Sequence, residues 1–270
     1  MSTKNLNNSK KVDLSEAESI LKIKSITNEA MTGDCNYYET SQFKTNFPIS
    51  ESLSFFHLSI SSLPKHFENL TALLQELEAD FKIIGITETR LKTDTLPHNL
   101  DIPKYTFLAN TTESSAGGTA LYIHESLDFR MRDDLAKCMY KSKELESTFI
   151  ELDLPNQSNM IVGCIYKHPS FSKRYFTDEY LQAVLDKTNR ERKILVILGD
   201  FNINLLDDQS LDVNHFVDCL SSNSVLPLIT LPTRFSNTHN ETLIDNIFSG
   251  TQDFDIKSGN ILAAGPAEQF

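Results

Sequence analysis

Residues 199–202 read Gly-Asp-Phe-Asn and follow directly on the apolar run Ile-Leu-Val-Ile-Leu at 194–198. A short run of branched apolar residues that ends in glycine is typical of a buried strand. An acid, Asp200, and an amide, Asn202, come immediately after it. Taken alone, Asp200 could be a turn residue, because Asp and Asn side chains bond nearby backbone groups. The alternative is that a rigid strand presents a catalytic group at its end.

The composition limits the classes of protein to which the chain can belong. Its 270 residues are 40% hydrophobic and 23% charged, which suits one large or two small globular domains. The net charge of −12 argues against non-specific electrostatic binding to nucleic acid. It leaves room for a local basic groove, or for divalent cations that bring positive charge to an acidic site.

The sequence favours an intracellular protein, cytoplasmic or nuclear. It contains neither a secretory signal nor an apolar run near the roughly 20 residues that a membrane span needs. The four cysteines lie far apart without a CxxC pair, so we expect no zinc site and no disulfide framework.

The chain divides into a polar start and a patterned remainder. Residues 1–50 are rich in Asn, Ser and Lys, and we expect a weakly ordered leader whose helical signal is the capping-box spacing of Ser15 and Glu18. Strands are predicted at 53–60, 81–86, 105–109, 119–124, 147–154, 160–166, 193–199 and 241–249, and helices at 66–79, 176–189 and 215–222. Strands that run together in the middle of the chain favour an α+β layered domain.

Polar side chains stand at the ends of three predicted strands and inside a fourth apolar segment. Glu88 and Asp200 each follow a strand, Tyr166 ends one, and Asp245 lies within Leu-Ile-Asp-Asn-Ile-Phe. Alone, Glu88 is best explained as an exposed acid and Tyr166 as an aromatic at the rim. Asp245 is harder to explain, since burying it is costly unless a partner or a metal compensates the charge. His57, His98, His124 and His215 are expected to be structural or surface residues.

The order of these segments resembles a known family. The series TETRL (87–91), IYKHP (165–169), ILGDFNINLL (197–206), LPTR (231–234) and TLIDNIF (242–248) is similar to the endonuclease/exonuclease/phosphatase superfamily. More narrowly, it resembles the apurinic-type endonuclease domain at the front of non-LTR (LINE-like) retrotransposon polyproteins. The resemblance implies a DNase I-like fold, a four-layered α/β sandwich of two mixed β-sheets packed face to face with outer helices. It assigns residues 51–262 to this domain and 263–270 to a divergent tail.

The resemblance also implies a role for each residue. Glu88 would bind Mg²⁺ or Mn²⁺, a hard cation suited to carboxylate oxygens. Asp200 would orient and deprotonate the attacking water, and Asn202 would hydrogen-bond the scissile phosphate. Tyr166 matches a phosphate-contacting tyrosine, and Asp245 matches an acid that holds a histidine against the phosphate. Near the DNA-facing rim lie Thr233 and Arg234. DNA is the implied partner, with no membrane and no small-molecule cofactor.

Two departures from the family pattern stand out. The first strand normally ends in Asn in a motif like LNISSLP, whereas this chain reads HLSISSLP with Ser59 at that place, which predicts a weaker contact. The family's last strand carries Ser-Asp-His some 20–30 residues after the LIDNIF acid, whereas this sequence reads SGNILAAGPAEQF, and its last histidine, His239, precedes Asp245. Without that strand we expect exposed sheet edges.

Two functions therefore remain open. The first is a metal-dependent endonuclease that nicks target DNA for a retrotransposon, with this chain a truncated or impaired copy. The second is a remnant that at most binds nucleic acid or another protein. A third possibility is a phosphoinositide or sphingomyelin phosphodiesterase of the same superfamily. It is less favoured, because the sequences of the motifs resemble those of retrotransposon endonucleases. No reverse-transcriptase segment follows in this sequence, so transposition of a whole element is not expected from it.

Overall fold

A computed structural model describes residues 35–47, 52–92, 99–113, 115–154, 158–235, 241–250 and 256–262. The capping-box signal at Ser15 and Glu18 and the expected tail at 263–270 lie outside these ranges. None of the helices in the described ranges combines the length and the apolar character that a membrane span needs.

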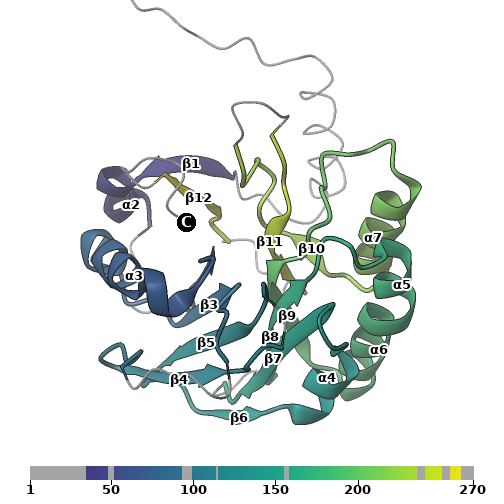
Figure 1. Cartoon of the computed structure of the whole chain (residues 1–270), viewed down its shortest axis with the longest axis horizontal. Coiled ribbons are helices and arrows are strands. Elements are labelled where there is room, and N and C mark those ends of the chain that lie inside the picture. The colour runs from purple at the N-terminus through teal and green to yellow at the C-terminus, as the bar shows by residue number, and fades with distance from the viewer. Residues whose placement is uncertain are drawn as a thin grey trace, which may run out of the picture.

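The core of the molecule consists of two mixed sheets (Figure 1). In the six-stranded sheet, β8 and β9 are parallel and the other neighbours antiparallel. In the four-stranded sheet, β2 and β3 are parallel and the rest antiparallel. The six strands are, in order, β10 (Leu226–Pro227), β11 (Asp245–Ser249), β9 (Ile194–Asp200), β8 (Met160–Lys167), β7 (Leu145–Leu152) and β6 (Phe129–Met131). The four are β2 (Phe55–Ser59), β3 (Ile83–Thr87), β5 (Thr119–His124) and β4 (Tyr105–Ala109).

Helices cover the outer face of each sheet, which gives four layers (Figure 1). Against the four-stranded sheet pack α2 (Thr40–Asn46) and α3 (Leu63–Leu77). Against the six-stranded sheet pack α4 (Asp133–Cys138), the π-helix η2 (Phe176–Leu181), α6 (Gln182–Glu191) and α7 (Leu211–Ser222). The short α5 (Lys173–Tyr175) lies against η2 and α7. A third apolar cluster fills the space between the two sheets. The predicted fold class, α+β with two mixed sheets in the DNase I-like arrangement, is confirmed.

The apolar run at 194–198, which forms most of β9, is buried on both faces. Along β9, Leu195 and Ile197 pack toward the helices, while Val196 and Leu198 pack between the sheets. Successive side chains of a strand point to opposite faces, so a strand covered on both sides needs apolar residues at every position. Asp200 continues the alternation of Val196 and Leu198 and therefore ends the strand on the face between the sheets.

Several boundaries differ from the sequence-based expectation. The strands at 105–109 and 119–124 agree, but the expected strand at 241–249 begins only at Asp245. The expected helix at 215–222 begins earlier, at Leu211, and the helix from 176 starts as a π-helix and runs to Glu191. The short elements β6 and α4 were not predicted, since three and six residues are too few to show a clear period.

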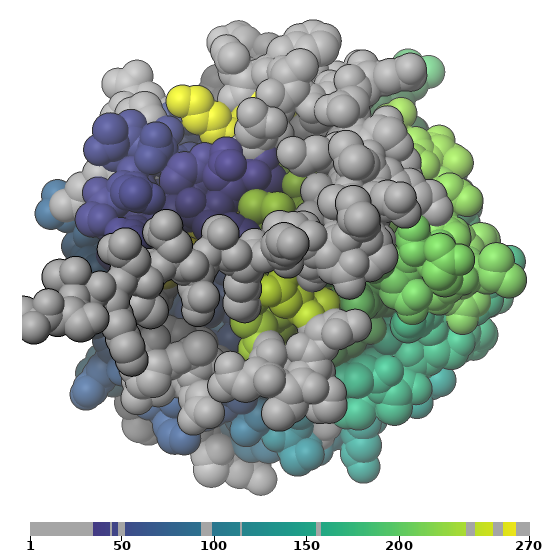
Figure 2. All heavy atoms as spheres, turned by 90° about the horizontal axis from the view of Figure 1, so that it is seen from above, coloured from purple at the N-terminus to yellow at the C-terminus, as the bar shows by residue number. Residues whose placement is uncertain are grey.

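Part of the expected leader packs on the domain. Residues 36–39 form strand β1 (Asn36–Glu39), which pairs in parallel with β12 (Gly259–Leu262) in a separate two-stranded sheet. Figure 2 shows the yellow atoms of the C-terminal residues beside the purple β1–α2 segment. Phe43 of α2 is only 4% exposed and stacks on Phe47 at a ring-centroid distance of 5.1 Å. Residues 35–47 thus differ from the weakly ordered leader expected up to residue 50, because their few aromatic residues are enough to anchor them.

Strand β2 lies at one edge of the four-stranded sheet. Within the described residues, the last strand, β12, pairs with β1 and not with β2. An edge strand presents backbone groups that are free to pair with another strand.

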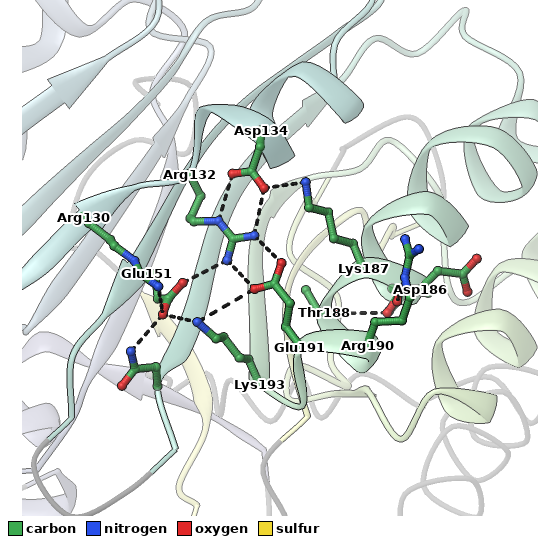
Figure 3. A network of polar contacts seen from close by, with 12 residues as sticks. Arg130, Arg132, Asp134, Glu151, Asp186, Lys187, Thr188, Arg190, Glu191 and Lys193 are labelled. Carbon is green, nitrogen blue, oxygen red and sulfur yellow. Dashed lines mark hydrogen bonds and ion pairs between the residues drawn. The ribbon is translucent and has the colours of Figure 1, made fainter.

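A buried ion-pair network ties β6, β7 and α4 to the end of α6 (Figure 3). Glu151 is 1% exposed and accepts hydrogen bonds from Arg130, Arg132 and Lys193. Arg132 in turn forms paired bonds to Asp134. The network fixes the layer of helices on the six-stranded sheet.

Candidate active site

One row of polar side chains crosses the end of the six-stranded sheet. Asp245 of β11 lies opposite Asp200 of β9, which is in register with Tyr166 of β8, and Tyr166 pairs with Glu146 of β7. Residues in register share a face of the sheet. The alternation of β9 places this row on the inner face, so the four side chains lie where the space between the two sheets opens.

The four-stranded sheet contributes the facing side. Ser59 pairs in register with Thr87 at the ends of β2 and β3. One layer deeper, His57 Nε2 lies 3.0 Å from Thr87 Oγ1. Burial lowers the pKa of His57 to about 4, with the charge of Asp245 opposing this shift and that of Arg234 adding to it. His57 is therefore a neutral histidine within electrostatic reach of Asp245.

Asp200 is an unusually placed carboxylate, with 0% exposure. Burial raises its pKa, the facing Asp245 raises it further, and the guanidinium of Arg234 works in the opposite direction. Its Oδ1 accepts a hydrogen bond from the backbone N–H of Asn202 at 3.1 Å. A buried carboxylate whose pKa is raised is poised to accept a proton.

The guanidinium of Arg234 lies among three carboxylates. Its Nη2 donates to Asp200 Oδ2 at 2.7 Å and lies 3.9 Å from Glu88 Oε1. Its Nε lies 3.5 Å from Asp245 Oδ2, an oxygen that also accepts from Thr233 Oγ1 at 3.1 Å. The residues matched to the family's PTR segment therefore contact the centre of the site, not only its rim.

Glu88 faces a second arginine. Arg90 Nη2 lies 3.3 Å from Glu88 Oε2 and donates to Ser61 Oγ at 3.0 Å. The backbone N–H of Arg90 donates to the carbonyl of Gly117, a residue with φ of 115°. This loop holds Glu88 at the mouth of the sandwich.

Two of the predicted site residues have strained backbones. Glu88 has φ of 53° and Asn202 has φ of 47°, both in the left-handed region that non-glycine residues seldom adopt. Each such residue costs of order 1–3 kcal/mol, and such strain clusters at functional sites. The left-handed turn at Asn202 brings its Nδ2 to the carbonyl of Lys167 at 2.8 Å.

Tyr166 is 3% exposed, so nearly all of the residue is covered, unlike an aromatic residue at the rim. Burial raises the pKa of the phenol, and the charges of Glu88 and Asp200 raise it further. The phenol is therefore neutral and lies within electrostatic reach of the same acids.

The structure brings the sequence-predicted residues together at one end of the sandwich, and their catalytic roles stay predictions. Sequence reasoning missed three residues of this site: Arg90, Glu146 and His57. Arg90 stands within the quoted motif TETRL and His57 within HLSISSLP, so the motifs themselves carried the signal. Glu146 gave no signal, because only strand register places it beside Tyr166.

The donor set suits a divalent cation, although its arrangement is not a finished metal site. Carboxylate oxygens are the ligands that Mg²⁺ and Mn²⁺ prefer. Asp245 Oδ1 is buried and finds no hydrogen-bond partner among the described residues. Across the same residues, however, no three acidic, histidine or cysteine side chains form a ready-made metal cluster. Glu88 would hold the ion, with Asp200 and Asp245 beside it, and Arg234 now lies between these three carboxylates.

Comparison with solved structures supports the fold. The AP endonuclease LMAP from Leishmania major matches with a TM-score of 0.61 at 13% identity, covering 90% of this chain and 91% of that one. The human Nocturnin catalytic domain gives 0.51 at 13% identity, covering 73% and 81%. The 3′ phosphatase NExo from Neisseria, bound to a product DNA hairpin, gives 0.50 at 15% identity, covering 73% and 86%. No curated protein matches the sequence significantly.

A family profile decides the assignment. The profile of the Endonuclease/Exonuclease/phosphatase family matches residues 53–259, which include both sheets and every predicted site residue. The two mixed sheets, the outer helices and the acidic site at their end agree with this match. The chain belongs to the Endonuclease/Exonuclease/phosphatase family.

Proposed function

We propose that this chain is a divalent-metal-dependent phosphodiesterase that nicks DNA, of the kind found at the front of non-LTR retrotransposon polyproteins. The observation that carries the proposal is the row formed by Asp245, Asp200 and Tyr166 across three neighbouring strands, with Glu88 facing it. The retrotransposon assignment rests on the ordered motifs of the sequence. A solved structure of the same fold holds a product DNA hairpin, which supports DNA as the substrate.

Asp200 is the residue that we assign to water activation. Its burial and its raised pKa make it a base that can take a proton from a water molecule near neutral pH. It ends a strand that is buried on both faces, so its carboxylate is rigidly positioned. The bond from the N–H of Asn202 further orients it.

The remaining polar groups suit the phosphate. Asn202 and Tyr166 would donate hydrogen bonds to its oxygens from positions on either side of Asp200. Arg90 and Arg234 supply positive charge in a chain whose net charge is −12. A bound Mg²⁺ or Mn²⁺ ion would neutralise charge on the phosphate and stabilise the leaving oxygen. Each donor directed at charge that develops in the transition state contributes roughly 10²–10³ in rate.

Conversion of supercoiled plasmid to open circles by the full chain, in Mg²⁺ or Mn²⁺, tests the proposal. We expect slow nicking that EDTA stops and that Asp200→Ala abolishes, and Ser59→Asn should increase it. Nicking that persists in Asp200→Ala would overturn the residue roles.

A second candidate function has its own support. The guanidinium of Arg234 lies where a cation is needed, and no finished metal cluster exists among the described residues. Both observations favour a catalytically impaired chain that binds nucleic acid or another protein. Retention of DNA on a filter without nicking, at any metal concentration, would select this candidate.

A further inference from the structure

Three acidic side chains of the site lie around two arginines. Among the described residues, the carboxyl groups of Glu88, Asp200 and Asp245 face the guanidinium groups of Arg90 and Arg234. The side chains of these three acids are at most 16% exposed, so water screens them weakly. Such a cluster is costly unless cations lie within it.

Arg234 is the cation that holds the cluster together. It reaches all three carboxylates, whereas Arg90 reaches only Glu88. A guanidinium and a divalent ion cannot occupy the same space between these oxygens. A divalent ion bound there would supply to these oxygens the positive charge that Arg234 now supplies.

The backbone that carries Arg234 is firmly tied. Its N–H and carbonyl both pair with Thr242 at 3.0 Å. Pro232 lies two residues before Arg234. Its carbonyl accepts hydrogen bonds from Tyr37 Oη at 2.9 Å and from Asn260 Nδ2 at 3.0 Å. The sheet formed by β1 and β12 thus braces this segment, and only the side chain has freedom to leave. That side chain is 45% exposed, so it can turn toward solvent.

We infer that Arg234 is a resident counter-ion of the three carboxylates and that a divalent ion must displace its guanidinium in order to bind. The inference rests on the proposed function, because it takes these carboxylates as the ion site. The displaced guanidinium becomes available to a phosphate, which it can bind through two parallel hydrogen bonds. Ion binding and substrate binding are thereby coupled through one side chain.

Calorimetric titration of Mn²⁺ into the full-length protein and into Arg234→Gln tests the inference without relying on activity. Removal of the competing guanidinium should lower the Kd for Mn²⁺ at least about fivefold, the lower end of typical coupling between ligands. Arg234→Lys should give an intermediate Kd, since an ammonium is a competing charge without the planar fork. The matched control is Arg174→Gln, which makes the same change in charge in an exposed pair with Asp178 and should leave the Kd unchanged.

A second measurement follows the side chain itself. Phenylglyoxal modifies accessible arginines, and peptide mass mapping gives the rate at each one. Saturating Mn²⁺ should accelerate labelling of Arg234 and leave Arg174 unaffected. If Arg234→Gln unfolds more readily, Mn²⁺ should raise its Tm by more than it raises that of the wild type.

The outcomes separate the two proposals. Equal Mn²⁺ affinity in wild type and Arg234→Gln, with unchanged labelling of Arg234, would overturn the counter-ion role while the proposed function stands. Absence of Mn²⁺ binding in both proteins would overturn the ion site and the inference together. If Arg174→Gln also binds Mn²⁺ more tightly, the gain in affinity comes from the change in net charge and not from the position of Arg234. That result would also overturn the inference.

Discussion

Asp245 and Asp200 lie directly opposite each other on neighbouring antiparallel strands, with both carboxylates on the inner face of the six-stranded sheet. Directly opposed side chains have Cβ atoms about 4.5–5.5 Å apart, and like charges there are destabilising. The fold tolerates the pair because Arg234 contacts both acids and Thr233 donates to one. The site is therefore a place where the molecule gives up stability for an arrangement of charge.

Asp200→Asn should stabilise the protein while abolishing nicking. The amide keeps an oxygen that can accept from Arg234, and it removes the repulsion from Asp245, which predicts a gain of about 1 kcal/mol in the free energy of unfolding. Urea unfolding measures the gain, and the plasmid assay measures the loss. Asp153→Asn, which changes the charge equally at an exposed position, is the control and should alter neither. A loss of stability in Asp200→Asn would contradict the idea that this pair is strained.

Glu151→Gln should be strongly destabilising. Burial of Glu151 raises its pKa, but hydrogen bonds from Lys193, Asn159, Arg130 and Arg132 outweigh burial and lower the pKa from its ordinary 4.5 to about 2. Neutralising this acid removes the buried charge that Arg132 and Lys193 both face, which costs up to about 3–5 kcal/mol. The matched control is Asp80→Asn, whose pair with Lys104 is more than half exposed and contributes less than about 1 kcal/mol.

The same ion-pair network predicts an acid dependence. Because the pKa of Glu151 is lower in the folded state, its contribution is complete above pH 4.5 and disappears as the pH falls toward 2. The difference in unfolding free energy between wild type and Glu151→Gln should therefore shrink over this window. Urea unfolding measures this difference. If it stays constant from pH 6 to pH 3, the contribution of Glu151 to stability does not depend on its charge.

Phe43→Ala should destabilise the domain although residue 43 belongs to the polar start of the chain. The ring packs between Phe47 and Phe81, at centroid distances of 5.1 and 5.7 Å, so its removal should cost about 3–5 kcal/mol. The control is Leu211→Ala, whose side chain is 82% exposed and should matter by less than about 0.5 kcal/mol. Equal, small effects of both substitutions in thermal unfolding would mean that α2 does not pack on the domain.

These residues also show what the sequence can predict. The strand before Asp200 was predictable because burial on both faces leaves a local apolar run. The burial of Phe43 could not be predicted, because one aromatic residue in a polar segment forms no repeating apolar pattern. The ordered motifs predicted which acids would meet, since they reflect a known fold. The row from Asp245 to Glu146 depends on strand register, and the position of the Arg234 guanidinium depends on three separate segments, so neither leaves a local pattern.

Gly199→Ala should lower the free energy of unfolding more than alanine at any other glycine near the site. Gly199 has φ of 155°, and a Cβ there would lie 1.9 Å from the carbonyl oxygen of Ile165 on β8. That oxygen belongs to the backbone of the parallel neighbour and cannot turn aside, so strands β8 and β9 must separate. We expect a cost at the upper end of the roughly 1–3 kcal/mol typical of overpacking.

The substitution should also displace Asp200, the next residue, and lower the nicking rate beyond what the loss of stability explains. Gly250→Ala is the matched control. A Cβ at Gly250 would approach the backbone of β9 at Leu195, and its nearest distance there would be 3.3 Å. Unfolding free energies and nicking rates of the two variants, both measured well below their Tm, separate stability from positioning. If folded Gly199→Ala nicks DNA as fast as Gly250→Ala, the rigid placement of Asp200 at the strand end is not what the reaction requires.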